Sequence, residues 1–140
     1  MSAEQLTAVK DLLDRCFGDS TWSLDILRSQ LEKTDSRCTV VIVDEIVVGF
    51  LAFEQVLDEG SIIEVAVHPE YRRRGIARRM IQSAVENAEN LSSVFLEVRE
   101  RNTAAIALYE ALGFTKVGVR KNYYDAPKEN GVIMKWEINL

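Results

Sequence analysis

The sequence predicts an α/β fold in which a mixed sheet lies between helices, and two observations support this. Short β-branched runs alternate with amphipathic stretches, in the order helix, helix, three strands, helix, strand, helix and two strands. The length of 140 residues, with 47% hydrophobic and 28% charged residues, suits one hydrophobic core. We therefore expect one domain over residues 1–140, without repeats or low-complexity linkers.

Two amphipathic helices are expected before the first strand. Apolar residues at helical spacing predict a helix over residues 5–17, and Gly18 is suited to end it. Ser23 or Asp25 is a suitable N-cap for a second helix, which carries leucines at helical spacing and runs to about residue 33.

A β-hairpin and a third strand are expected next. Residues 37–43 and 46–57 read as strands joined by a turn at Asp44 and Glu45, with Gly49 inside the longer strand. A second turn is expected at residues 58–60, before a strand over residues 61–67.

The rest of the chain alternates helices and strands. An apolar stripe predicts a helix over residues 75–90, and a strand is expected over residues 93–98. Asn102 is a natural N-cap for a helix that runs to residue 112 and stops at Gly113. Two closing strands are expected over residues 114–124 and 131–138, with a turn around residues 125–127.

Charge, cysteine and histidine content exclude several classes of function. Seventeen basic and 22 acidic residues give a net charge of −5, which argues against direct nucleic-acid binding. Cys16 and Cys38 lack the spacing of a zinc site and His68 is the one histidine, so no metal is expected. We expect both thiols to be core residues or inert, and His68 to be a surface residue at a strand end rather than a proton shuttle.

The chain also lacks the signals of membrane or secreted proteins. No segment approaches the run of about 20 apolar residues that a membrane helix needs. Residues 1–5 lack the basic-then-apolar pattern of a secretory leader. We therefore expect a cytoplasmic location and no membrane partner.

The most informative stretch is residues 65–77, which reads as an apolar strand, a basic turn and a helix start. The first amides of a helix have no intrahelical partner and together carry roughly half a positive charge, so they attract phosphate groups. Gly75 and Ala77 are small enough to let a ligand approach. Three arginines raise the local positive potential: Arg72, Arg73 and Arg74. The stretch predicts a site for a phosphorylated cofactor, and the alternative is a solvated arginine run.

The pattern Arg72-x-x-Gly75-x-Ala77 resembles the acetyl-CoA pyrophosphate loop of the GNAT (Gcn5-related) N-acetyltransferases, Gln/Arg-x-x-Gly-x-Gly/Ala. Residues 95–102 and 104–114 are similar to that family's next strand, the asparagine that opens the following helix and the tyrosine near its end. Within the family the chain resembles the ribosomal-protein-alanine N-acetyltransferases (RimI-type). That likeness rests on residues 96–99, 102–114, 120–124 and 132–134, and more weakly on residues 21–23.

The resemblance implies a GNAT-like fold, with a mixed, mostly antiparallel central sheet, helices on both faces and two splayed strands. The strands expected to splay at their C-terminal ends are residues 61–67 and 93–98. The implied co-substrate is acetyl-CoA, whose pantetheine arm would pair with the backbone of Val65, Ala66 and Val67. Asn102 is expected to hydrogen-bond the cofactor. The residues expected around the diphosphate are Arg73, Arg74, Gly75, Ile76, Ala77 and Arg78.

Glu97 and Tyr109 are the expected catalytic residues. A mid-strand carboxylate such as Glu97 is costly unless it faces a cleft or a partner. The resemblance implies that Glu97 takes the proton from the incoming amine and that Tyr109 gives a proton to the leaving sulfur. The alternatives for Glu97 are an exposed strand glutamate or a salt bridge with Arg99, and the alternative for Tyr109 is a half-buried aromatic with its hydroxyl in water. Glu64 is a rival base, because some GNAT enzymes use a glutamate on that strand.

The resemblance also implies the acceptor and the partners. The expected reaction is acetyl transfer to a protein N-terminal α-amine, with the N-terminal alanine of a small-subunit ribosomal protein as the acceptor. Lysine, polyamine or small-molecule amines are alternative acceptors, and a non-catalytic CoA-binding module is an alternative of another class. The sequence leaves the oligomeric state open.

Overall fold

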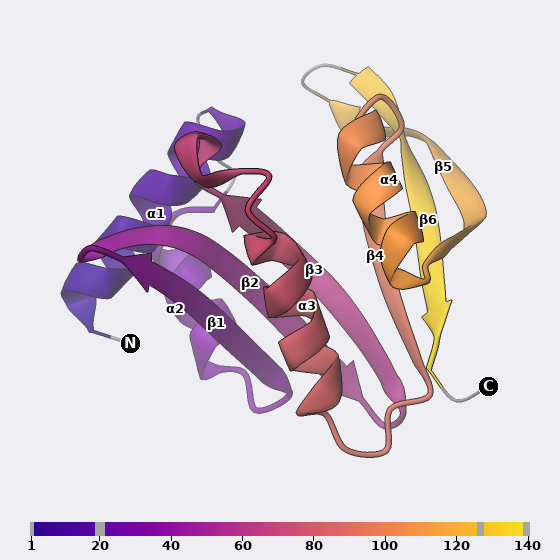
Figure 1. The fold of residues 1–140 in the computed structure, drawn as a ribbon, viewed down its shortest axis with the longest axis horizontal. Coiled ribbons are helices and arrows are strands. Elements are labelled where there is room, and N and C mark those ends of the chain that lie inside the picture. The colour runs from indigo at the N-terminus through magenta and orange to yellow at the C-terminus, as the bar shows by residue number, and fades with distance from the viewer. Residues whose placement is uncertain (1, 19–21, 126–127, 139–140) are drawn as a thin grey trace. The chain divides into compact units, whose positions relative to one another are not determined.

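A computed structural model describes residues 2–18, 22–125 and 128–138 of the chain (Figure 1). The elements are α1 (Ala3–Phe17), α2 (Leu24–Glu32), β1 (Ser36–Val43), β2 (Ile46–Val56), β3 (Glu59–Val67), the short 3₁₀ helix η1 (Pro69–Tyr71), α3 (Ile76–Glu86), β4 (Ser93–Arg99), α4 (Thr103–Leu112), β5 (Thr115–Asp125) and β6 (Lys128–Glu137). The strands form one hydrogen-bonded sheet in the order β1-β2-β3-β4-β6-β5. The predicted α/β class with a mixed sheet is confirmed.

Most of the sheet is antiparallel. β1 pairs with β2, β4 with β6 and β5 with β6 in antiparallel ladders, and β3 pairs with β4 in parallel. The parallel ladder is short, because it joins residues 59–61 to residues 93–95 only. Contacts divide the chain into two compact units, residues 1–54 with 63–87 and residues 55–62 with 88–140, which are described in turn. The expectation of a single domain stays a prediction.

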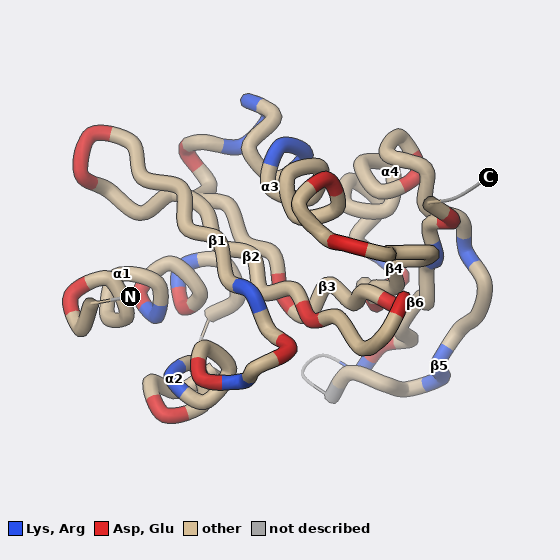
Figure 2. The backbone as a smooth tube through the Cα atoms, turned by 90° about the horizontal axis from the view of Figure 1, so that it is seen from below, with Lys and Arg blue, Asp and Glu red and all other residues tan. Residues whose placement is uncertain are grey.

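In the first unit, helices cover both faces of the strands β1 and β2 (Figures 1 and 2). On one face, α1 and α2 place Val9, Leu13 and Leu27 against Phe50 and Ala52 of β2. On the other face, a Cβ at Gly49 would lie 3.1 Å from Ile76 Cγ2, so α3 packs closely there. Residues 48–53 are therefore buried without interruption, as expected for a strand covered on both sides.

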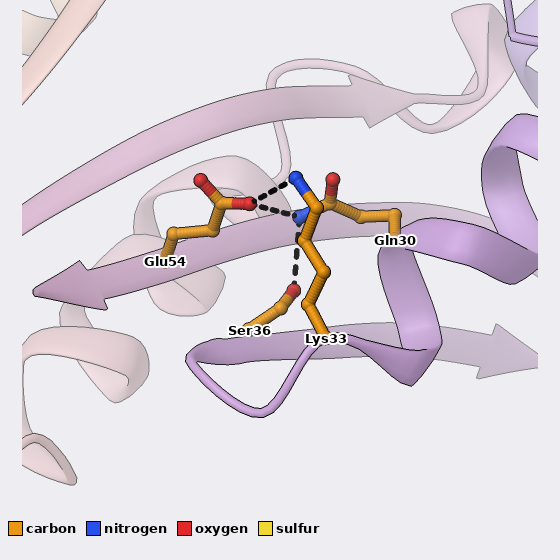
Figure 3. A network of polar contacts seen from close by, with 4 residues as sticks. All are labelled: Gln30, Lys33, Ser36 and Glu54. Carbon is orange, nitrogen blue, oxygen red and sulfur yellow. Dashed lines mark hydrogen bonds and ion pairs between the residues drawn. The ribbon is translucent and has the colours of Figure 1, made fainter.

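A polar network ties α2 to the hairpin of β1 and β2 (Figure 3). The Gln30 side-chain amide donates to Ser36 Oγ and to Glu54 Oε1, both at 2.9 Å. Lys33 Nζ donates to the same Glu54 oxygen at 3.0 Å. Burial raises the pKa of Glu54, but the hydrogen bonds from Lys33 and Gln30 outweigh burial and lower it below its usual value. The buried Gln30 is therefore satisfied, as a buried polar side chain must be.

In the second unit, alternate residues of β4 face opposite ways. Val94, Leu96 and Val98 are buried, whereas Phe95, Glu97 and Arg99 are partly exposed. The buried set belongs to a core that also contains residues of α4, β6 and the segment after α4: Tyr109, Leu112, Phe114, Val132 and Met134. Glu97 consequently lies on the face of β4 opposite to the buried side chains.

Several predicted boundaries hold and several are wrong. α2 begins after the predicted N-cap Ser23, and Asp44 and Glu45 form the hairpin turn with positive φ. The helix predicted over residues 5–17 begins at Ala3, because Ser2 and Gln5 form a capping box.

Three errors have non-local or side-chain causes. The turn predicted at residues 58–60 lies at residues 57–58, because residues 59 and 60 already pair with β4. The helix predicted over residues 75–90 ends at Glu86, where the Asn87 side chain donates to the Ser83 carbonyl at 2.9 Å. β6 begins at Lys128 rather than at residue 131, because Lys128 and Glu129 pair with the end of β5. Residues 126 and 127 of the predicted turn, and residue 21 of the weaker similarity, lie outside the described residues.

Candidate active site

The loop between β3 and α3 is built from local contacts within the first unit. The His68 N–H donates to the Val48 carbonyl at 2.8 Å, which ends β3 beside β2. His68 Nδ1 accepts from the Glu70 N–H at 3.1 Å, so the imidazole caps η1. The Arg74 guanidinium lies 4.9 Å from the centre of the Tyr71 ring. His68 is therefore a structural cap at a strand end, in agreement with the sequence prediction.

Gly75 starts α3 in a left-handed conformation. Its φ is 78°, in a region that residues with a Cβ adopt at a cost, and Arg73 also has a positive φ, of 65°. No side chain caps this helix start, and the first intrahelical bond to Gly75 comes from the Arg79 N–H at 3.0 Å. The amides of Ile76, Ala77 and Arg78 therefore precede the helical ladder.

The start of α3 has the features of an anion-binding site. The first turn of α3 carries no acidic residue, and residues 72–75, 78 and 79 are exposed. Figure 2 shows that lysine and arginine positions gather in the loop before α3 and in its first turn. A phosphate group at this helix start would meet free amide donors, the positive end of the helix dipole and arginine side chains. The local geometry is thus compatible with the predicted anion cradle, and anion binding there stays a prediction.

The C-terminal end of β3 presents backbone groups whose partners are side chains. The Val67 carbonyl accepts from Cys16 Sγ at 3.3 Å and from Arg72 Nε at 3.1 Å. The Val65 N–H donates to Glu64 Oε1 at 3.2 Å. Ala66 belongs to the core that α1 covers. The three residues expected to pair with pantetheine thus include two whose backbone groups bond to side chains here.

Glu64 is a half-buried carboxyl of β3. Burial raises the pKa of the Glu64 carboxyl to about 7, although hydrogen bonds from the Val65 N–H and the Trp22 side chain lower it. Trp22 in turn packs edge-on to Phe50, with ring centroids 6.2 Å apart. A carboxyl with such a pKa exchanges its proton near neutral pH, which suits a proton acceptor. Sequence reasoning named Glu64 as a rival base but missed the Trp22 contact.

Cys16 contacts the end of β3 and the loop that follows it. Besides its bond to the Val67 carbonyl, its side chain interacts with Arg72. Burial is the largest effect on its thiol and raises the pKa, which disfavours the reactive thiolate. Burial likewise raises the pKa of Cys38. Both cysteines are free and half-buried, as predicted for inert thiols.

In the second unit, the carboxylate of Glu97 has one oxygen in an ion pair and one without a partner among the described residues. Its Oε1 lies 3.2 Å from Arg120 Nε, in an ion pair whose side chains are 25% and 55% exposed respectively. Its Oε2 is buried and, within the described part of the chain, has no hydrogen-bond partner. Arg99, the partner considered from sequence, forms an ion pair with Glu129 at 3.2 Å. One acceptor oxygen of Glu97 is therefore unpaired among these residues and shielded from solvent.

Asn102 and Tyr109 lie on α4, as the sequence predicts. The Asn102 side chain accepts from the Ala105 N–H at 3.2 Å and caps the helix, so its oxygen already has a local role. Tyr109 is 7% exposed and meets Phe114 edge-on at 5.9 Å. Gly113 ends the helix with φ 122°, and a Cβ there would lie 2.6 Å from Trp136 Nε1.

The acetyltransferase (GNAT) family model matches residues 6–114, a stretch that includes the arginine loop, Glu97 and α4. This chain belongs to the GNAT family. The fold agrees: the crystal structure of the ribosomal-protein-S18-alanine N-acetyltransferase from Escherichia coli superposes with a TM-score of 0.88. That superposition covers 100% of this chain and 92% of the other, at 29% identity. The expected GNAT-like fold is confirmed.

Two curated relatives are N-terminal acetyltransferases. The bS18-alanine N-acetyltransferase of E. coli strain K12 is 38% identical over 96 residues, which cover 66% of this chain. The N-alpha-acetyltransferase of Saccharolobus solfataricus is 37% identical over 110 residues, which cover 68% of this chain. The chain spans about 65% of the length of each of these relatives.

The described residues contain neither a membrane-spanning helix nor a metal-binding cluster. No helix there is long and apolar enough to cross a membrane. The same residues contain no group of three or more His, Cys, Asp or Glu side chains that could hold a metal ion.

Proposed function

We propose that this protein is an acetyl-CoA-dependent N-acetyltransferase that acts on a protein N-terminal α-amine, namely the N-terminal alanine of a small-subunit ribosomal protein. The observation that carries the proposal is the uncapped, arginine-lined start of α3 in a chain of the GNAT family. The relatives named for bS18-alanine and N-alpha acetylation support the class of acceptor.

In this proposal the first unit binds acetyl-CoA. The amides of Ile76, Ala77 and Arg78 donate to the diphosphate. Three arginines complement its charge: Arg73, Arg74 and Arg78. The backbone of residues 65–67 pairs with the pantetheine arm, for which the Val65 N–H must leave Glu64 Oε1 and the Val67 carbonyl must give up one of its two donors. Asn102 is the further residue proposed to hydrogen-bond the cofactor.

The proposed acceptor, an α-amine, loses its proton more readily than a lysine amine does. An α-amine has an ordinary pKa of about 8 and a lysine amine one of about 10.4, so deprotonating the α-amine costs roughly 3 kcal/mol less near neutral pH. Glu97 has an unpaired oxygen that could hold that proton, because Oε2 has no partner among the described residues; it is buried, so the amine or a water must first gain access to it. An N-terminal amine therefore asks less of the base than a lysine amine does.

The chemistry divides between Glu97 and Tyr109. Acetyl-CoA supplies the acetyl group as a thioester. As the amine nitrogen forms its bond to the acetyl carbon, Glu97 Oε2 takes the proton that the nitrogen loses, directly or through water. As the carbon–sulfur bond breaks, the Tyr109 hydroxyl gives its proton to the departing sulfur. Proton transfer from Glu97 to Tyr109 through solvent then restores both residues.

Glu64 is the competing candidate for the base. Its pKa of about 7 suits proton exchange, but its carboxyl already accepts from the Val65 N–H and the Trp22 side chain. The comparison of Glu97→Gln with Glu64→Gln across pH separates the two. We expect Glu97→Gln to lower kcat about a hundredfold and Glu64→Gln to retain most of the rate. If Glu64→Gln alone causes the large loss and removes a pH dependence near neutral pH, Glu64 is the base.

The proposed function is tested by transfer to defined peptides. The protein is incubated with acetyl-CoA and a peptide that begins with alanine, and thiol release and peptide mass are followed together. The matched control is the same peptide with a blocked N-terminus and one internal lysine. We expect a mass gain of one acetyl group on the free N-terminus and none on the control.

Two results would contradict the proposal. Transfer to the lysine of the blocked peptide, without transfer to the free α-amine, would assign another acceptor class. Tight binding of acetyl-CoA without transfer to any amine would indicate a non-catalytic CoA-binding module.

A further inference from the structure

The strand register of the second unit brings Glu97 and Arg120 to one face of the sheet. Glu97 of β4 pairs with Ile133 of β6, and Ile133 pairs with Gly118 of β5, so these three residues form a row. Arg120 follows Gly118 by two positions and therefore points to the same face. Gly118 has no side chain, so no β5 side chain stands in that row and Arg120 reaches Glu97 diagonally.

The resulting ion pair involves one carboxylate oxygen of Glu97, and the other oxygen has no partner among the described residues. Arg120 Nε holds Glu97 Oε1 at 3.2 Å, while Oε2 is buried without a partner among the described residues. A glutamate side chain has several rotatable bonds, and a contact at one oxygen restricts where the second oxygen points. Because the pair is partly exposed, it adds little to folding stability. Its geometry is therefore better explained by orientation than by stability.

Arg120 is itself held in place. Its guanidinium lies 5.3 Å from the centre of the Tyr123 ring. That ring packs over Gly131, where a Cβ would come within 3.2 Å of Tyr123 Cδ2. The β5 backbone bends to permit this, with Asn122 at φ 52° and its N–H donating to Asn130 Oδ1 at 2.9 Å. A glycine and a strained asparagine thus support the position of the guanidinium.

We propose that Arg120 is a positioning residue for the reaction, which fixes the Glu97 carboxylate so that Oε2 receives the proton of the acceptor amine. The inference rests on the proposed function and adds to it a residue that acts through Glu97. Arg120 holds Oε1, Tyr123 holds Arg120, and Gly131 leaves the space that Tyr123 fills.

The test is a set of variants in the peptide-transfer assay. Arg120→Gln should lower kcat by roughly tenfold or more and leave KM for acetyl-CoA unchanged, because a misplaced catalytic group slows the chemical step. Arg120→Lys should recover part of the loss, since an ammonium can still pair with Oε1. Lys121→Gln is the matched control: it removes the same charge from the exposed neighbouring position and should leave kcat unchanged.

A double variant tests whether Arg120 acts through Glu97. Once Glu97→Gln is present, Arg120→Gln should cause little further loss, because the group it positions is gone. Losses that multiply in the double variant, or an Arg120→Gln protein with the kcat of the wild type, would overturn the inference.

A spectroscopic readout keeps the inference testable if no acetyl transfer occurs. The ¹³C resonance of the Glu97 carboxyl should move in Arg120→Gln and stay in place in Lys121→Gln. An unmoved resonance in Arg120→Gln would show that the pair is absent in solution and would overturn the inference. Absence of transfer by the wild type would refute the proposed function alone.

Discussion

Replacing Glu64 by glutamine should remove a pH-dependent cost to folding. Burial raises the pKa of this carboxyl from 4.5 to about 7, so the folded state holds the proton more tightly than the unfolded state. Glu64 consequently favours folding below pH 4.5, and that contribution is lost as the pH rises through 7. Glutamine keeps a side-chain oxygen that can accept from the Val65 N–H and Trp22, but it does not ionise.

The magnitude follows from the two pKa values. Between pH 5 and pH 8, linkage gives a loss of roughly 2.5 kcal/mol for a carboxyl whose pKa is 4.5 unfolded and about 7 folded. The unfolding free energy of Glu64→Gln relative to the wild type should therefore rise by about that amount over this interval. In urea, the midpoint of the variant relative to the wild type should move up by about 1 M.

Urea unfolding of both proteins at the two pH values is the assay. Other groups titrate equally in both proteins, so the difference between them isolates Glu64. Glu86→Gln, at an exposed position of α3, is the control and should show the same pH dependence as the wild type. A constant difference between Glu64→Gln and the wild type would refute the reasoning, because Glu64 would then titrate alike in the folded and unfolded states.

Three further substitutions have defined outcomes. Gly75→Ala forces a Cβ onto a residue with φ 78°, at a cost of about 1–2 kcal/mol, and calorimetry should find CoA binding weakened about tenfold. Gly113→Ala combines φ 122° with a Cβ 2.6 Å from Trp136 Nε1, so thermal unfolding should report a loss of about 3 kcal/mol. Ser23→Ala removes the cap on the Ile26 N–H and should cost about 1 kcal/mol in urea unfolding, whereas Ser23→Asp should retain most of the stability. Unchanged binding or stability in any of the three variants would contradict the assigned role of that residue.

The elements that the sequence predicts correctly depend on local signals. Ser23 and Asn102 cap helices, and Gly113 ends one, because capping involves residues within one turn of each other. The start of β3 depends on pairing with a strand far away in the sequence, and the end of α3 depends on a side-chain hydrogen bond. Residue 59 is in a strand because it pairs with residue 93, and α3 stops where Asn87 bonds back to Ser83.

The candidate site likewise has features that a local motif predicts and features that depend on contacts formed on folding. The arginine loop is a contiguous motif, so the sequence predicts both its place and its positive helix start. The partner of Glu97 depends on the register of three strands, and Arg120 reaches it past a glycine. Burial raises the pKa of Glu64, and the hydrogen bond from Trp22, a residue of a distant segment, acts in the opposite direction. A sequence motif therefore identifies the candidate site residues, but the partners of Glu97 and Glu64 depend on how the chain folds and packs.

The central claim is that the start of α3 binds the diphosphate of coenzyme A, and calorimetry with two ligands tests it most directly. Wild-type protein titrated with CoA should bind it, and pantetheine, which lacks the diphosphate and the nucleotide, should bind at least tenfold more weakly. A folded protein that takes up no CoA, or that binds both ligands equally, would contradict the account.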